Sequence, residues 1–290
     1  LTGLEIYKKL PKENCKECGL PTCLAFAMKV AAGQAGLDSC PRLTDDARDE
    51  LGEASAPPQR LVTIGTGSHA IEVGQETVMF RHDEKFHHPT AVALTISDAD
   101  GEPAIHDRCK QFAELEFTRV GQTISPDMIA LRNDSGDAGT LLKAAEMIYN
   151  DLGVSMVVIS ENAQSLREVA IGPLSGAGPV LWCTGEVSVE EIAGMAEKHA
   201  IPVCQDADLA GVASCVEELA SQDVKDVLIS PGQVRPSEVL SFLTKSRRAA
   251  LLKKFRPLGC PVIVSACGDD KQAAALDAAT YVAKYAAVLV

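Results

Sequence analysis

The amino-acid sequence predicts an α/β protein, a (β/α)8 or TIM barrel preceded by a small α-helical domain. From residue 91 onward, short β-branched and aliphatic runs alternate with helical patterns. Four cysteines lie within the first forty residues, and a proline-containing stretch with few large apolar residues separates them from the alternating region. Alternation of strand and helix is typical of a parallel sheet covered by helices.

Eight short segments after residue 90 have the apolar composition of buried parallel strands. Helical patterns lie between them, as in residues 137–150, where Leu141, Ala145 and Ile148 share one face. Eight such units close a barrel, whereas an open doubly wound sheet usually has five or six strands. The eighth segment ends the sequence, so we expect a barrel without its last helix, from a longer polypeptide. The eight segments are AVALTIS, MIALR, VSMVVIS, PVLWCT, PVCQD, DVLIS, PVIVSA and AAVLV.

The sequence is expected to divide into a four-cysteine domain (residues 1–53), a linker (54–60) and the barrel region (61–290). The linker prediction depends on GEASAPPQR, which is small, proline-containing and without apolar periodicity. Within the barrel region, RLVTIGTG, AIEVG and ETVMF predict a layer of short strands over residues 61–90. Residues 91–290 then form the barrel itself.

Three short helices are expected in the cysteine-containing domain. TGLEIYKKL forms the first, and Pro11 ends it. In the second, TCLAFAMKVAAGQ, the residues Leu24, Met28 and Ala31 are expected to face a core. Thr44 is expected to cap a third helix, DDARDEL.

Composition and charge exclude several classes of partner. Hydrophobic residues make up 46% of the chain and charged residues 23%, as in folded globular proteins. The net charge of −13 disfavours a nucleic-acid surface, which needs clustered Lys and Arg. No segment reads as a signal peptide or as an apolar run long enough to cross a membrane. We therefore expect a cytoplasmic protein without nucleic-acid or membrane partners.

The first four cysteines, Cys15, Cys18, Cys23 and Cys40, follow a C-x2-C-x4-C-x16-C-P pattern. Three close cysteines followed by a distant Cys-Pro favour a cuboidal iron-sulfur cluster. A structural zinc site usually takes two close pairs of ligands, and only Cys15 and Cys18 form such a pair. The third interpretation is that the cysteines are unliganded or form disulfides. Disulfides are rare in the reducing cytoplasm, which disfavours this interpretation.

Two other groups of metal-ligand residue types have simpler interpretations. RHDEKFHH contains His82, His87 and His88 without a matching cysteine or carboxylate pattern, so we favour a solvated loop or a subunit contact over a metal site. The other six cysteines are expected to be small buried hydrophobes. They are Cys109, Cys183, Cys204, Cys215, Cys260 and Cys267.

The first 41 residues, LTGLEIYKKLPKENCKECGLPTCLAFAMKVAAGQAGLDSCP, strongly resemble the N-terminal domain of the large (gamma) subunit of the corrinoid iron-sulfur protein. The likeness continues in ETVMFRHDEKFHHPTAVAL, RVGQ, FRPLGCPVIV and YVAKYAAVLV, so it covers essentially the whole sequence. It implies a 4Fe-4S domain, a TIM barrel and a C-terminal corrinoid-binding domain beyond residue 290. It also implies that the cluster ligands are Cys15, Cys18, Cys23 and Cys40.

The family belongs to the reductive acetyl-CoA (Wood-Ljungdahl) pathway of anaerobes. The resemblance implies that the corrinoid accepts a methyl group from a methyltetrahydrofolate-dependent methyltransferase and passes it to acetyl-CoA synthase. The chain is thus expected to be a methyl-carrier component, paired with the small (delta) subunit, rather than a stand-alone catalyst. The 4Fe-4S cluster is expected to serve the reductive reactivation of cobalt.

The alternative is a pterin-binding TIM-barrel methyltransferase with a structural zinc or iron-sulfur head. Catalytic groups of TIM barrels lie at the C-terminal ends of the strands. Polar residues at those positions either bind a ligand such as a pterin or, more commonly, begin loops and cap helices. Here they are Ser97, Asp98, Asn133, Asp134, Ser160, Asn162, Thr184, Asp206 and Ser230.

Overall fold

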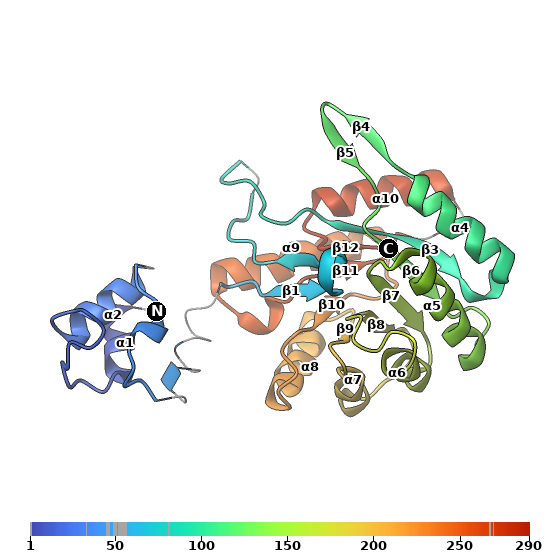
Figure 1. Cartoon of the computed structure of the whole chain (residues 1–290). Coiled ribbons are helices and arrows are strands. Elements are labelled where there is room, and N and C mark those ends of the chain that lie inside the picture. Colours follow the sequence, from blue (N-terminus) through green and yellow to red (C-terminus); the bar gives the residue numbers. More distant parts are fainter. Residues whose placement is uncertain are drawn as a thin grey trace. The chain divides into compact units, whose positions relative to one another are not determined.

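The structure is a computed structural model, and the chain forms two compact units, Leu1–Pro57 and Pro58–Val290 (Figure 1). Residues 54–56 of the predicted linker lie outside the described residues. Among the residues that are described, no helix combines the length and the apolar character needed to cross a bilayer. The structure describes residues 2–32, 34–44, 47–48, 51, 57–80, 82–266, 268 and 270–290.

Eight parallel strands of the second unit, as described, form the barrel, in the order β10-β9-β8-β7-β6-β3-β12-β11. A parallel bridge between Ile229 and Val262 joins the two outer strands of this order and closes the ring. Each predicted strand segment overlaps one of these strands, so the barrel prediction is confirmed. The strands are β3 (Ala91–Ser97), β6 (Met128–Arg132), β7 (Met156–Ser160), β8 (Val180–Cys183), β9 (Ile201–Gln205), β10 (Leu228–Ser230), β11 (Ile263–Val264) and β12 (Val288–Leu289).

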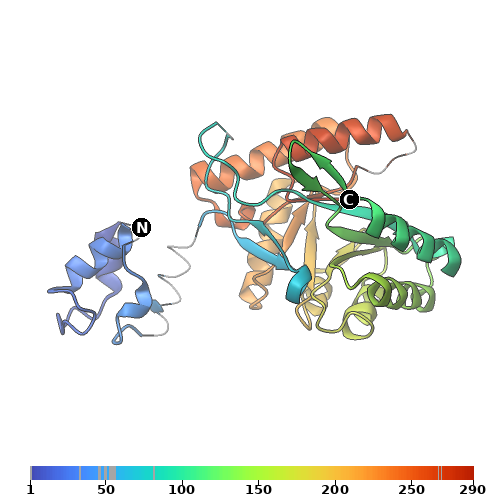
Figure 2. The same cartoon turned by 45° about the horizontal axis from the view of Figure 1, so that its top comes forward.

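Helices on the outside of the barrel follow seven of the strands (Figure 2). Asp137 caps the start of the helix after β6, because its carboxylate accepts a hydrogen bond from the Thr140 N–H at 2.7 Å, and Gly153, with a φ of +64°, caps its end. In between, Leu141 and Ile148 face the strands, as predicted, and are fully buried. The helices are α4 (Glu102–Glu114), α5 (Ala138–Leu152), α6 (Ala163–Ile171), α7 (Val189–Met195), α8 (Leu209–Ser221), α9 (Pro236–Lys253) and α10 (Lys271–Ala283), with short 3-10 turns at Gly67–His69, Asp98–Asp100 and Arg256–Leu258.

An antiparallel pair of short strands, β1 (Leu61–Ile64) and β2 (Ile71–Gly74), closes the N-terminal end of the barrel. Its apolar side chains, such as Ile64, belong to the same buried cluster as the interior of the barrel. The N–H of Gly65 donates to the carbonyl of Gly178 at 2.9 Å, just before β8. Side chains of the pair thus fill the end of the barrel opposite the C-terminal ends of its strands.

The third strand predicted for this layer, ETVMF, is not a strand. Its backbone groups bind distant side chains instead of a neighbouring strand. The N–H of Glu76 donates to Gln59 Oε1 at 3.1 Å, and the carbonyl of Val78 accepts from Arg247 Nη2 at 2.7 Å. The segment therefore crosses the barrel surface as an irregular connection.

A hairpin that the sequence analysis does not predict lies between α4 and β6. Its strands are β4 (Phe117–Arg119) and β5 (Gln122–Ile124), and all six residues are exposed. Val120 and Gly121 form the turn with φ values of +52° and +77°. The hairpin extends away from the barrel in Figure 1.

The first unit contains α1 (Gly3–Lys9), α2 (Cys23–Ala31) and a 3-10 turn at Leu37–Ser39. The prediction that Leu24, Met28 and Ala31 face its core is wrong, because α2 buries Cys23, Phe26 and Ala27 instead. A large aromatic ring such as that of Phe26 removes more apolar surface from water than Leu24 would. Leu24 and Met28 are 41% and 57% exposed.

The third predicted helix of this unit falls mostly outside the described residues. Thr44 does act as expected of a helix cap, since its Oγ1 accepts a hydrogen bond from the Ala47 N–H at 3.3 Å. Ala47, Arg48 and Leu51 are helical, and a helix over the other residues of DDARDEL stays a prediction.

Candidate functional site

All four cysteines of the first unit are free thiols, and three of them belong to or pack against one small core. Cys23 and Cys40 are buried within it, at 8% and 5% exposure. Cys18 packs against the same cluster, and Cys15 is half-buried. The core therefore collects thiols from three separate stretches of chain, and two of them are shielded from water.

The loop that carries Cys15 has an unusual backbone. Lys12, Asn14 and Lys16 have φ values of +61°, +48° and +63°, whereas the residues between them have ordinary φ values. Such left-handed residues cost energy and cluster at functional sites. Alternating hands also turn successive N–H groups toward one point, which forms the anion-binding concavities found at many iron-sulfur sites. The loop that carries Cys15 therefore has the alternation of φ from which such concavities are built.

Arg42 ties this loop to the segment that carries the fourth cysteine. Its guanidinium donates to Glu13 Oε2 at 2.6 Å and to Glu17 Oε1 at 2.7 Å. The hydrogen bond from Arg42 holds the pKa of the Glu17 carboxyl below its usual range. Glu13 and Glu17 flank Cys15, and Arg42 follows Cys40 by two residues, so the network joins the two parts of the cysteine set.

The two kinds of metal site need different spacings between the thiols. No three His, Cys, Asp or Glu side chains of the described residues lie close enough together to hold one metal ion. A tetrahedral zinc at about 2.3 Å from each sulfur would bring the sulfurs to about 3.8 Å from one another. In a cuboidal cluster each thiolate binds a different iron, so the sulfurs stand further apart.

The three histidines of RHDEKFHH do not converge on one point. His88 places Nδ1 2.8 Å from the carbonyl oxygen of Gly74, and the side chain of His82 is 80% exposed. The backbone N–H groups of His87 and His88 donate to the buried carboxylate of Glu76 at 3.0 and 2.8 Å. This segment thus binds the irregular ETVMF connection.

Most polar residues predicted at the strand ends hold loops together. The Asp98 carboxylate is 2% exposed and accepts from the N–H groups of Asp134 and Ser135 at 2.8 and 2.9 Å. Asn133 donates through Nδ2 to Ser160 Oγ at 2.9 Å. These contacts join the ends of β3, β6 and β7 and leave the Asp98 carboxylate no exposed acceptor for a ligand.

Others of this set accept hydrogen bonds from nearby backbone N–H groups. Ser97 accepts from Ala99, Asn162 from Gln164 and Ser165, Asp206 from Asp208, and Ser230 from Gly232. The loop and cap interpretation therefore describes these residues better than the ligand-binding one.

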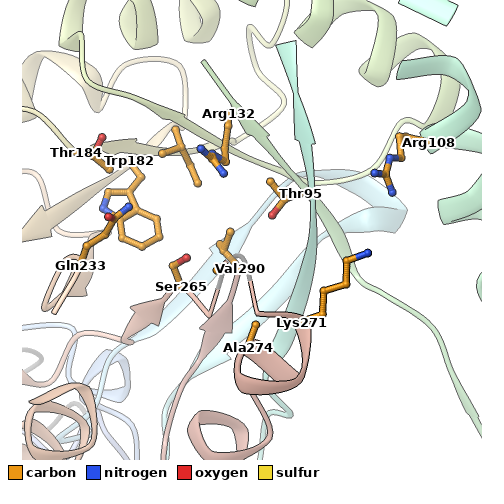
Figure 3. Close-up of a pocket in the computed structure, with 12 residues that line it drawn as sticks. Thr95, Arg108, Arg132, Trp182, Thr184, Gln233, Ser265, Lys271, Ala274 and Val290 are labelled. Carbon is orange, nitrogen blue, oxygen red and sulfur yellow. The ribbon is translucent and has the colours of Figure 1, made fainter. Parts of the chain in front are cut away.

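A cavity of about 720 Å³ opens at the C-terminal end of the barrel (Figure 3). Of the nine predicted strand-end residues, only Thr184 lines it. The sequence analysis missed Thr95, Arg132 and Trp182, which lie on β3, β6 and β8. Strand periodicity is the signal that finds them, because alternate residues of a barrel strand face inward. The described lining residues are Thr95, Arg108, Arg132, Ile159, Trp182, Thr184, Gln233, Ser265, Gly268, Lys271, Ala274 and Val290.

The cysteines of the barrel unit are mostly buried, as expected. Cys109, Cys183, Cys204 and Cys260 are at most 2% exposed, and burial raises the pKa of the Cys260 thiol to about 12. Cys215 is half-buried, and its Sγ lies 3.0 Å from Cys204 Sγ. Cys267 lies outside the described residues.

Fold and site together define a (β/α)8-barrel protein with a separate cysteine-rich unit. Residues 61–290 match the family model "CO dehydrogenase/acetyl-CoA synthase delta subunit", and residues 10–42 match a model described as "Putative Fe-S cluster". The chain belongs to the CO dehydrogenase/acetyl-CoA synthase delta subunit family.

The names of similar proteins match the family that the sequence resembles. The corrinoid/iron-sulfur protein large subunit of Moorella thermoacetica is 36% identical over 100% of this chain and 65% of the relative. The acetyl-CoA decarbonylase/synthase complex subunit gamma of Methanopyrus kandleri is 31% identical over 91% of this chain and 58% of the relative. The chain thus spans less than two thirds of the length of these two relatives, and the predicted resemblance is confirmed.

Solved structures with similar folds include dihydropteroate synthases. Dihydropteroate synthase from Thermus thermophilus gives a TM-score of 0.54 at 17% identity, over 79% of this chain and 92% of that one. The Xanthomonas albilineans dihydropteroate synthase gives 0.51 at 12% identity over 79% and 92%. At such identity the likeness concerns the fold alone.

Proposed function

We propose that this chain supplies the 4Fe-4S domain and the barrel of a methyl-carrier large subunit in the reductive acetyl-CoA pathway. The observation that carries the proposal is that the free thiols of Cys18, Cys23 and Cys40 gather at one small core, and that the loop of Cys15 is joined to it by the hydrogen bond from the Cys23 N–H to Asn14 Oδ1 at 2.8 Å. We assign residues 1–53 to the cluster domain, 54–60 to a linker and 61–290 to the barrel. The names of the two relatives support the same assignment.

Cys15, Cys18, Cys23 and Cys40 are the proposed ligands. A cluster bound there would supply one-electron transfer. Burial of Cys23 and Cys40 excludes water from one side, while the half-buried Cys15 and Cys18 leave the other side near the surface, where electrons enter and leave. The charged Lys12–Lys16 loop beside Cys15 would help to set the reduction potential of the cluster, which depends on net charge and on hydrogen bonds to the sulfurs.

In the whole protein a corrinoid would supply the cobalt that carries the methyl group from a methyltetrahydrofolate-dependent methyltransferase to acetyl-CoA synthase. The small (delta) subunit is the proposed permanent partner, in a cytoplasmic complex. The four-cysteine domain would pass one electron from a low-potential donor to cobalt, which would return it from Co(II) to Co(I) after accidental oxidation. It would not take part in the methyl transfers themselves.

The alternative, a pterin-binding methyltransferase, finds less support in the geometry of the barrel. Its likeness to dihydropteroate synthase concerns the fold alone. The Asp98 carboxylate, the most buried of the strand-end acids, is occupied by loop amides. The described lining of the mouth contains no Asp or Glu that could accept hydrogen bonds from a pterin ring.

The test uses the full-length corrinoid protein that carries this sequence, assembled with its small subunit. Cys23→Ala should abolish reduction of Co(II) by a low-potential donor, while a single methyl transfer started from Co(I) should proceed at the wild-type rate. Cys109→Ala, which changes a buried cysteine of α4, is the matched control and should preserve both. Reactivation of Co(II) by Cys23→Ala at the wild-type rate would refute the assigned role.

A further inference from the structure

The mouth of the barrel concentrates positive charge in an acidic protein. The whole chain has 40 Asp and Glu against 27 Lys and Arg. The described lining of the 720 Å³ cavity nevertheless holds Arg108, Arg132 and Lys271 and no Asp or Glu. Nothing in the proposed electron transfer uses these three cations, so they need a separate explanation.

The acidic groups near the mouth neutralise only part of this charge. Arg132 Nη2 lies 2.7 Å from Asp134 Oδ1. Arg108 and Lys271 pair with no Asp or Glu among the described residues. Asp270, next to Lys271, accepts instead from the N–H groups of Gln272 and Ala273 at 2.9 and 3.2 Å. Two of the cations are therefore available to a ligand.

Besides the cations and several hydroxyl and amide groups, the cavity has apolar lining residues. Trp182 is 2% exposed, and its indole N–H donates to Gln205 Oε1 at 2.6 Å, which fixes the ring. Ile159 and Val290 line the cavity beside it. Figure 3 shows Arg132 on the Trp182 side and Arg108 with Lys271 on the other side of Thr95. A ligand in this cavity would meet cations on two sides of Thr95, together with the apolar faces of Trp182, Ile159 and Val290.

We propose that the barrel mouth binds a small organic polyanion whose carboxylate or phosphate groups contact Arg108, Arg132 and Lys271. The guanidinium fork matches both groups with paired hydrogen bonds. The cavity volume lies within the range of about 300–1,000 Å³ that is usual for small-molecule sites. The N-terminus of α10 is already capped by Asp270, so recognition depends on the side chains rather than on that helix end.

Trp182 is the single tryptophan of the chain, so its fluorescence reports directly on the lining of the cavity. The purified chain would be titrated with citrate and, separately, with pyrophosphate at constant ionic strength. We expect a saturable fluorescence change with at least one of them. A stronger response to citrate assigns the site to carboxylates, and a stronger response to pyrophosphate assigns it to phosphates.

Variants test whether the cations of the mouth cause the response. Arg108→Gln combined with Arg132→Gln should weaken binding at least about tenfold, and Lys271→Gln alone should weaken it in the same direction. Arg167→Gln is the matched control, because Arg167 pairs with Glu197 on the outside of the barrel and should bind as the wild type does. Far-ultraviolet circular dichroism would verify that each variant folds.

Three results would overturn the proposal. The first is no saturable response to either anion. The second is binding that survives the double substitution and Lys271→Gln unchanged. The third is saturable binding of 6-hydroxymethylpterin without binding of either anion, which would assign the mouth to a pterin.

Discussion

Arg247 is a buried charge that fastens an irregular segment to the barrel, and replacing it should destabilise the barrel strongly. The residue is 4% exposed. Its Nη2 and Nε donate to the Val78 carbonyl at 2.7 and 3.2 Å. The guanidinium also lies 4.5 Å from the centroid of the Phe86 ring and 4.7 Å from that of Tyr285. Arg247→Met keeps most of the volume and removes every donor.

The size of the effect follows from these contacts. Hydrogen bonds from a charged group contribute about 1.5–3 kcal/mol, and two desolvated cation-π contacts add about 1 kcal/mol each. Glu76 is the counter-charge, and its Oε2 lies 3.9 Å from Arg247 Nη2. In the variant Glu76 keeps the hydrogen bonds from the His87 and His88 N–H groups, so leaving its carboxylate without Arg247 adds little to the destabilisation. We expect the free energy of unfolding to fall by about 3–5 kcal/mol, the usual cost of breaking a buried ion pair.

Urea unfolding followed by Trp182 fluorescence is the assay, because Trp182 lies inside the barrel and reports on that unit. Arg248→Met is the matched control, since the neighbouring Arg248 is exposed and its replacement should change stability by less than about 0.5 kcal/mol. Equal unfolding midpoints for the two variants would refute the role assigned to Arg247.

Three further changes have expected outcomes. Asp137→Ala removes the cap of α5 and should lower the midpoint of urea unfolding. Because hydrogen bonds lower the pKa of Asp137, the cap stabilises fully above the ordinary pKa near 4 and is lost as the pH falls through the lowered value. The midpoints of wild type and variant should therefore converge in acid, and a difference that persists there would contradict the cap. Diamide should oxidise Cys204 and Cys215, whose sulfurs lie 3.0 Å apart, to a disulfide, and two electrons and two protons pass to diamide. Peptide mapping checks the pairing, and a disulfide formed mainly with another cysteine would contradict this contact. Arg42→Gln should release iron to a chelator faster than the wild type does, because it breaks the hydrogen bonds to Glu13 and Glu17. Arg235→Gln, which breaks an exposed ion pair with Glu238, is the control and should release iron at the wild-type rate. Equal rates of iron release from Arg42→Gln and wild type would contradict the role of Arg42 in holding the cysteine loop.

The barrel could be predicted from the sequence because buried parallel strands must be apolar on both faces, which produces the uninterrupted runs of the eight segments. ETVMF has a similar composition and is not a strand. Its backbone partners are the side chains of Gln59 and Arg247, and the latter is distant in the sequence. Tertiary contacts of this kind leave no local pattern. The β4–β5 hairpin does leave one, since Gly121 interrupts alternating residues, but three-residue strands are too short to stand out.

The two candidate sites differ in how much a sequence can reveal. The four cysteines are recognisable because their spacing is local and their chemistry is specific. At the barrel mouth the predicted strand-end residues are mostly loop anchors, and the lining comes from inward-facing positions such as Thr95 and Arg132. Strand ends must be known to within one residue to separate the two groups, because a shift of one residue turns a side chain to the other face.

The central claim is tested most directly by the metal content of the anaerobically purified chain. Iron, acid-labile sulfide and zinc would be measured, followed by electron paramagnetic resonance after reduction with a low-potential donor. The account predicts about four irons and four sulfides per chain, with a reduced-cluster signal that is absent from Cys23→Ala and present in Cys109→Ala. One zinc and no iron would contradict it and would leave the four cysteines as a structural metal site.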